Sequence, residues 1–126
     1  MLNFVFSPDS KPTRENVFNR SNRYMYELEG DFSVVINGTE YFESGGIPVI
    51  EFIDQAEAWI AKANETADFL YDCVDTDDKP LMAFRYRDGF FTFRSPWELA
   101  RSEDQLTFED IRSAVEQLLK QLADAI

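Results

Sequence analysis

Residues 31–43, DFSVVINGTEYFE, predict a β-hairpin, and this hairpin decides the fold class. Asn37 and Gly38 form the dipeptide that best tolerates the positive φ angles of a two-residue turn. The strand before the turn spans residues 31–36, and the returning strand spans residues 39–43. We therefore expect a sheet in which neighbouring strands run antiparallel.

Strand patterns continue on both sides of this hairpin. Before it, residues 2–6 predict a short first strand and residues 7–16 predict a polar loop. Residues 23–29 alternate between apolar and polar side chains, which is typical of a half-buried strand. After the hairpin, we expect the sheet to break at Ser44-Gly45-Gly46, because glycines favour turns over strands.

Three further strands are expected in the second half of the chain. Their patterns lie in residues 68–74, 81–87 and 90–94, and the polar residues 75–80 form a turn between the first two. Asp88-Gly89 is a second hairpin turn, because it allows positive φ angles like those expected at the first turn.

Two segments have the periodicity of amphipathic helices. Residues 48–63 carry apolar side chains at helical spacing, and Pro48 suits the first turn of a helix. Thr107 with Asp110 resembles a capping box and opens a second helix that runs to the C-terminus. The expected buried stripe of this second helix consists of Phe108, Ile111, Val115, Leu118, Leu119, Leu122 and Ile126.

The order of these elements is strands, helix, strands, helix, without βαβ alternation. This order predicts an α+β fold, in which a mostly antiparallel sheet is packed on one face by two amphipathic helices. The 126 residues suit a single domain, and we see no linker or internal repeat.

The charge of the chain restricts the partners that it can bind. Its 24 acidic and 12 basic residues give a net charge of -12. Such a field repels the phosphates of nucleic acids and anionic lipids and attracts basic proteins. The apolar residues 2–6 have no basic segment before them, and no stretch approaches the roughly 20 apolar residues of a membrane span. We expect a cytoplasmic protein with a basic protein partner.

The absence of histidine excludes several kinds of chemistry. Catalytic triads, Cys/His dyads and histidine zinc sites all need a residue that this sequence lacks. Cys73 is the single cysteine, so no disulfide can form within the chain. We expect it to be a small buried side chain in its strand. No cofactor and no enzymatic activity are expected.

The densest acidic cluster is Asp72, Asp75, Asp77 and Asp78. A solvated turn, a partner-facing acidic patch and a metal site are the alternatives for it. The central Gly and the terminal Glu of a calcium-binding loop are absent, which disfavours the metal site.

Carboxylates also recur on the first predicted helix, at Glu51, Asp54 and Glu57. General acid/base catalysis by such a group needs burial that shifts its pKa. We expect all three to face solvent or to lie at the margin of the apolar stripe, because they fall outside the Ile53/Ile60 positions.

Arg85 and Arg87 are expected on one face of their strand, with Arg94 near them across the turn. Surface ion pairs are the leading interpretation, an anion or carboxylate pocket is the second, and a nucleic-acid platform is disfavoured by the net charge. Trp59 is expected in the core. Trp97 lies in the irregular segment 95–105, where core packing is favoured over a role as an interface anchor.

Taken together, the length, the acidity, the hairpin turn at Asn37-Gly38 and the segment FFTFRSPW at residues 90–97 resemble bacterial immunity proteins of polymorphic and contact-dependent toxins. The resemblance implies binding to a cognate toxin domain and blocking of its active site or substrate path. The contact residues that we predict for this role are Asp72, Asp75, Asp77, Asp78, Trp97 and Glu98. A regulatory or adaptor domain and, less favoured, a carboxylate- or metal-dependent enzyme are the alternatives.

Overall fold

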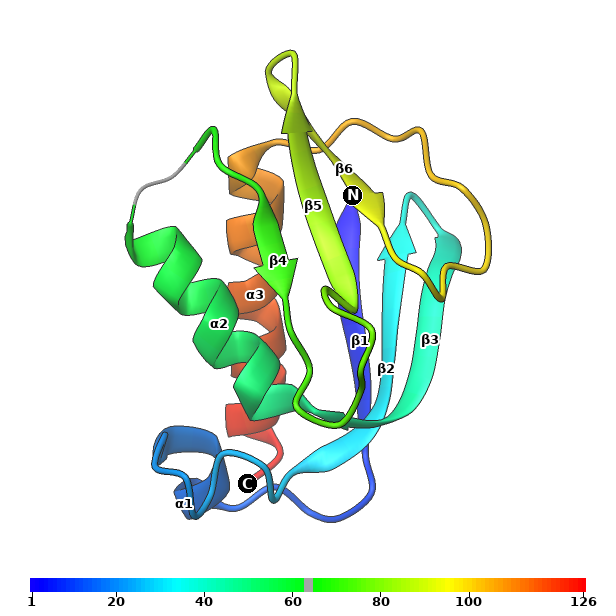
Figure 1. Ribbon diagram of the computed structural model, residues 1–126. Coiled ribbons are helices and arrows are strands. Elements are labelled where there is room, and N and C mark those ends of the chain that lie inside the picture. The colour runs from blue at the N-terminus through cyan, green and yellow to red at the C-terminus, as the bar shows by residue number, and fades with distance from the viewer. Residues whose placement is uncertain (63–64) are drawn as a thin grey trace.

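The computed structural model describes residues 1–62 and 65–126 and contains two sheets and three helices (Figure 1). The elements in chain order are β1 (Leu2–Pro8), α1 (Arg14–Phe18), β2 (Glu29–Ile36), β3 (Thr39–Pro48), α2 (Val49–Ala61), β4 (Phe69–Tyr71), β5 (Met82–Arg87), β6 (Phe90–Arg94) and α3 (Phe108–Asp124). The α+β class is confirmed, but the strands are divided between two sheets, and α1 was not expected. The predicted end of the first long helix, Ala63, lies outside the described residues.

The first sheet has the order β1-β2-β3, with both pairs antiparallel. Its hairpin turn is confirmed, because Asn37 and Gly38 have φ angles of 50° and 85°. The break expected at Ser44-Gly45-Gly46 is wrong, since β3 continues to Pro48, which pairs with Glu29. A register shift in β2 and a positive φ angle of 67° at Gly46 let the strand pass this point without ending.

The second sheet has the order β4-β5-β6, again antiparallel. Its turn at Asp88 and Gly89 is confirmed by φ angles of 53° and 91°. The predicted bounds of β6 match the structure, whereas β4 ends at Tyr71 and is shorter than the expected strand over residues 68–74.

Two expectations near the N-terminus are wrong. The helix α1 lies inside the segment expected to be a polar loop, and its N-terminus is closed by reciprocal hydrogen bonds between Thr13 and Asn16. Residues 23–29 are not a strand until Glu29, because residues 22–27 form turns in which Tyr24 and Met25 donate to the Ser21 carbonyl. In the described part of the chain, no strand pairs with residues 22–27, so their alternation does not correspond to a place in a sheet.

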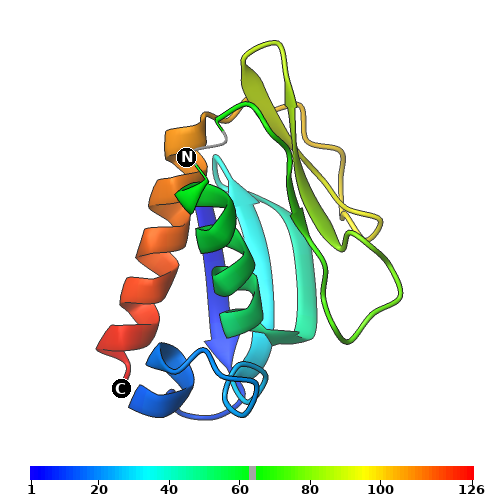
Figure 2. The same cartoon turned by 60° about the vertical axis from the view of Figure 1, so that its left-hand side comes forward.

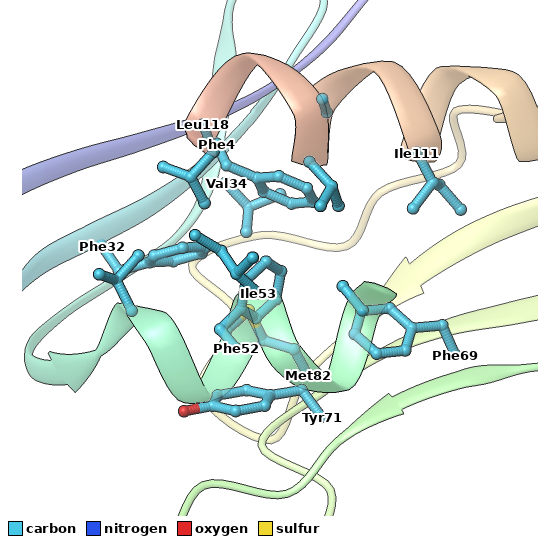
Figure 3. Packing of buried hydrophobic residues seen from close by; sticks show 14 of the residues in the cluster. Phe4, Phe32, Val34, Phe52, Ile53, Phe69, Tyr71, Met82, Ile111 and Leu118 are labelled. Atoms are coloured by element: carbon cyan, nitrogen blue, oxygen red, sulfur yellow. The ribbon is translucent and has the colours of Figure 1, made fainter. Parts of the chain in front are cut away.

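The two sheets face each other, and α2 lies in the opening between them (Figure 2). Ring contacts cross from sheet to sheet, with centroids 6.0 Å apart for Phe4 and Phe84 and 6.4 Å apart for Phe42 and Phe93. Phe52 of α2 completes this core, in the region shown in Figure 3. A single apolar core therefore joins the elements of both sheets.

The helix α3 packs along β1 and α2 and begins as predicted. Thr107 and Asp110 form the capping box. Most of the expected stripe is buried or partly buried, but Ile126 is 45% exposed because the helix ends before it, at Asp124. Among the described residues, no helix combines the length and the apolar character needed to cross a bilayer.

Candidate functional site

Three side chains of α2 hold the segment that carries the acidic cluster. Glu51, Gln55 and Trp59 are spaced four residues apart, so they share one face of the helix. Trp59 Nε1 donates to the Ala67 carbonyl at 3.1 Å, and the Gln55 amide both donates to and accepts from the Asp72 backbone, at 2.9 and 3.0 Å. Side chains of α2 thus bind the backbone on both sides of β4. The bonds to Asp72 fix the start of residues 72–78, which we call the acidic segment.

Glu51 is the third member of this row, and our expectation that it faces solvent or lies at the stripe margin is wrong. It is only 5% exposed. Its carboxylate accepts from the Tyr71 hydroxyl at 2.6 Å and from the Val74 backbone N–H at 3.2 Å. The reason lies in the tertiary structure, because α2 is enclosed by two sheets and buries more of its circumference than a helix on one sheet.

Asp54 and Glu57, in contrast, remain half-exposed and share Arg20 as a counter-ion. The guanidinium of Arg20 lies 3.5 Å from Asp54 and 3.4 Å from Glu57. The three carboxylates of α2 therefore do not form one site, and the pairing of acid and base that catalysis would need is absent from them.

Replacing Glu51 by Gln should change how stability depends on pH. Burial raises the pKa of Glu51, against the smaller lowering effect of its hydrogen bonds from Tyr71 and Val74. The folded state therefore keeps the proton of Glu51 to higher pH than the unfolded chain, and its contribution to stability declines as the pH rises through the raised pKa. We expect Glu51→Gln to gain stability relative to the unmodified protein as the pH rises through this range, measured by urea unfolding at several pH values.

Glu57→Gln is the control for this prediction, because it removes the same charge from a half-exposed position of the same helix. The difference in pH dependence between the two variants isolates the effect of burial at position 51. A stability difference for Glu51→Gln that stayed constant with pH would contradict a raised pKa at Glu51.

The acidic segment and the segment after β6 meet on the surface. Asp72, Asp75, Asp77 and Asp78 are all exposed. Trp97 Nε1 donates to Asp78 Oδ2 at 2.6 Å, which joins the two segments. Trp97 is 39% exposed and is not part of the buried core cluster, so the expected core packing is wrong. We call Asp75, Asp77, Asp78, Trp97 and Glu98 the Trp97 surface.

Two acids of β2 lie beside glycines that line a cleft next to this surface, and sequence reasoning did not single them out. A small cleft of about 110 Å³ between β3 and the acidic segment is lined by residues that include Gly45, Gly46, Asp75 and Trp97. The carboxylates of Asp31 and Glu29 lie beside these glycines: a Cβ at Gly45 would be 3.1 Å from Asp31, and one at Gly46 would be 3.8 Å from Glu29. Only the pairing of β3 with β2 beyond residue 44 brings these acids here, so no local pattern could have found them.

The arginines of the second sheet lie on its outer face, as expected. Arg85 is two residues after Ala83, and Ala83 is directly opposite Arg94, so all three share this face. Arg85 pairs with Asp68 at 3.1 Å, whereas Arg87 has only the neighbouring Asp88, at 3.8 Å. Arg85 and Arg94 line a common hollow of about 340 Å³, and Arg87 does not.

Among the described residues, the buried polar or charged side chains are those of Asn16, Glu51, Ser95 and Ser102. The predicted burial of Cys73 is confirmed, but its predicted place in a strand is wrong, because β4 ends at Tyr71. Within residues 1–62 and 65–126, no three His, Cys, Asp or Glu side chains are grouped so that they could hold a metal ion. The Trp97 surface and the arginine-lined hollow adjoin each other, because Asp78 and Glu98 belong to both.

Comparison with known proteins identifies a family without assigning a role. No curated protein and no solved structure matches the chain. A family match covers residues 3–126, which is nearly the whole sequence and extends from β1 to α3. The chain therefore belongs to the family described as Domain of unknown function (DUF7878).

Proposed function

We propose that this protein is an immunity-type inhibitor that binds a basic toxin domain through the Trp97 surface. The observation that carries the proposal is the hydrogen bond from Trp97 to Asp78, which unites an exposed aromatic ring with the acidic cluster. Aromatic side chains in the middle of a surface are the commonest anchors of protein interfaces. Carboxylates around them steer a basic partner and select against acidic ones.

The carboxylates of Asp75, Asp77 and Asp78 are exposed and available to a partner, whereas Glu98 pairs with Arg101 and its side chain is only 15% exposed. Among the described residues, no Lys or Arg side chain forms an ion pair with Asp75, Asp77 or Asp78. Two apolar side chains next to the surface in sequence, Val74 and Leu99, are 54% and 59% exposed. Acidic groups around exposed apolar groups suit a basic domain that also covers apolar area.

Hydrogen bonds within the free protein also hold residues 72–74 at the start of the acidic segment in place. Gln55 fixes Asp72, Glu51 fixes Val74, and Lys79 Nζ donates to the Cys73 carbonyl at 2.7 Å. A surface that is ordered in the free protein loses less conformational entropy when it binds. This rigidity suits an inhibitor, which has to bind tightly without performing a reaction.

The triple variant Asp75→Asn, Asp77→Asn, Asp78→Asn should lose the partner. We expect the immobilised unmodified protein to capture one basic protein from the lysate of its source cells at low salt. The variant should bind that protein at least about tenfold more weakly, because it lacks three carboxylates that attract the partner. Mass spectrometry identifies the captured protein, and titration of the purified partner gives the affinities.

A second triple variant, Asp9→Asn, Glu27→Gln, Asp124→Asn, distinguishes an effect of the Trp97 surface from an effect of the total charge. It makes the same change in charge at three exposed positions outside the Trp97 surface. If both triple variants weakened binding equally, the Trp97 surface would not be the binding site. Inhibition is tested by expressing the partner alone and together with this protein, and a partner that is harmless when expressed alone would contradict the inhibitor function.

A further inference from the structure

The outer face of the second sheet carries a hollow that borders the Trp97 surface and shares Asp78 and Glu98 with it. It lies beside β5 and β6, has a volume of about 340 Å³, and is lined by four cations, Lys79, Arg85, Arg94 and Arg101. We propose that this hollow binds a small organic acid that carries two or more carboxylate groups.

The concentration of positive charge here is unexpected in so acidic a chain. Four of the 12 basic residues line this one hollow, together with two carboxylates, those of Asp78 and Glu98. The lining therefore has an excess of cations, although acids outnumber bases two to one in the whole sequence. A local positive potential within a negative protein favours a small anion over an extended acidic partner, which the surrounding field would repel.

Two of these cations are held by groups that do not neutralise them. Arg94 Nη1 donates to the carbonyls of Phe93 at 2.8 Å and Ser102 at 2.6 Å, and its nearest ion-pair partner, Glu103, is 4.0 Å away. Lys79 donates to the Cys73 carbonyl. Carbonyl oxygens fix the positions of these side chains while leaving their charge available to an anion.

The other two cations have carboxylate partners but are more exposed. Arg85 binds Asp68 with a side chain that is 48% exposed, and Arg101 binds Glu98 at 2.9 Å with a side chain that is 60% exposed. A guanidinium has five N–H donors in a planar fork, so it can bind a second carboxylate while keeping the first. These arginines can therefore contribute to an anion site without breaking their ion pairs.

The rest of the lining indicates the kind of anion. Ala83 lies between the cations and is 2% exposed, and Pro80 and Pro96 also line the hollow. The two proline side chains, which are not buried, offer apolar contact to a short carbon skeleton. The volume lies at the lower end of the range for small-molecule sites. A compact polycarboxylate satisfies both features better than a single inorganic ion.

Titration of the isotopically labelled full chain with citrate and succinate at low ionic strength tests the proposal by NMR. We expect saturable shifts at the backbone amides of Lys79, Ala83, Arg85 and Arg94. Arg85→Gln should weaken citrate binding about tenfold, because it removes a charge-assisted hydrogen bond. Arg87→Gln is the matched control: it removes the same charge from the same strand face outside the hollow and should alter the affinity by roughly twofold or less.

Three outcomes would overturn the proposal. The first is the absence of saturable shifts with either acid. The second is an equal loss of affinity in Arg85→Gln and Arg87→Gln, which would mark a general effect of charge. The third is equal binding of the neutral diamide of succinate, which would show that the carboxylates are not recognised. The spectrum of each variant without ligand reports whether it folds.

Discussion

Phe52→Ala is expected to destabilise the protein by about 3–5 kcal/mol, the range for removal of a buried aromatic ring. Phe52 is fully buried, and its ring centroid lies 4.8 Å from that of Phe32 and 5.1 Å from that of Phe4 in the first sheet. On the other side it lies 5.8 Å from Phe69 and 5.2 Å from Tyr71 in the second sheet. Removing this ring leaves a cavity where α2 holds both sheets (Figure 3). Urea unfolding followed by the fluorescence of buried Trp59 measures the loss.

Phe18→Ala provides the control for this prediction. Phe18 ends α1 and is 52% exposed, so the same substitution removes a ring that has little buried contact. We expect its cost to stay below about 1 kcal/mol. If Phe52→Ala cost no more than Phe18→Ala, the assignment of Phe52 to the contact between the two sheets would be wrong.

Gly30→Ala is expected to destabilise the protein by about 3 kcal/mol, at the upper end of the usual cost of overpacking. Gly30 pairs with Pro8 in the first sheet. A Cβ at this position would lie 2.2 Å from the Ser7 carbonyl oxygen and 2.8 Å from the Pro8 Cα. Both are backbone atoms, so the strand β1 itself would have to move away from β2. The loss is measured as a shift in the midpoint of urea unfolding.

Gly45→Ala tests whether the close approach is the cause. The nearest atom to a Cβ there is a side-chain oxygen of Asp31, at 3.1 Å, which can rotate away. We expect this substitution to cost less than about 1 kcal/mol, even though it also replaces a strand glycine. Equal losses of stability at the two positions would show that the close contact between Gly30 and β1 does not cause the loss in Gly30→Ala.

Features that depend on near neighbours in the chain were predictable. The turns at Asn37-Gly38 and Asp88-Gly89 are confirmed because positive φ angles are a property of the turn residues themselves. The capping box of α3 is confirmed because its two partners, Thr107 and Asp110, lie three residues apart. The helix α1 was not predicted, because its five residues are too few to show a helical period and the nearby Pro8 and Pro12 favour a loop.

The surroundings of Glu51 and Trp97 could not be predicted in the same way. Glu51 resembles Asp54 and Glu57 in sequence, and only the packing of β4 against α2 distinguishes it. Trp97 resembles a core residue, and its exposure depends on where the chain goes after β6. Neither the burial of Glu51 nor the exposure of Trp97 is determined by residues close to it in the chain.

By itself, the sequence determined the fold class, both hairpins, the two long helices and the exclusion of histidine chemistry, because composition, periodicity and turn preference act locally. Only the tertiary structure divided the strands into two sheets, buried Glu51 and joined Asp78 to Trp97. These pairings link residues far apart in the chain. They depend on the burial of apolar faces against one another. The free energy of this burial comes from the whole assembled core and not from any single segment.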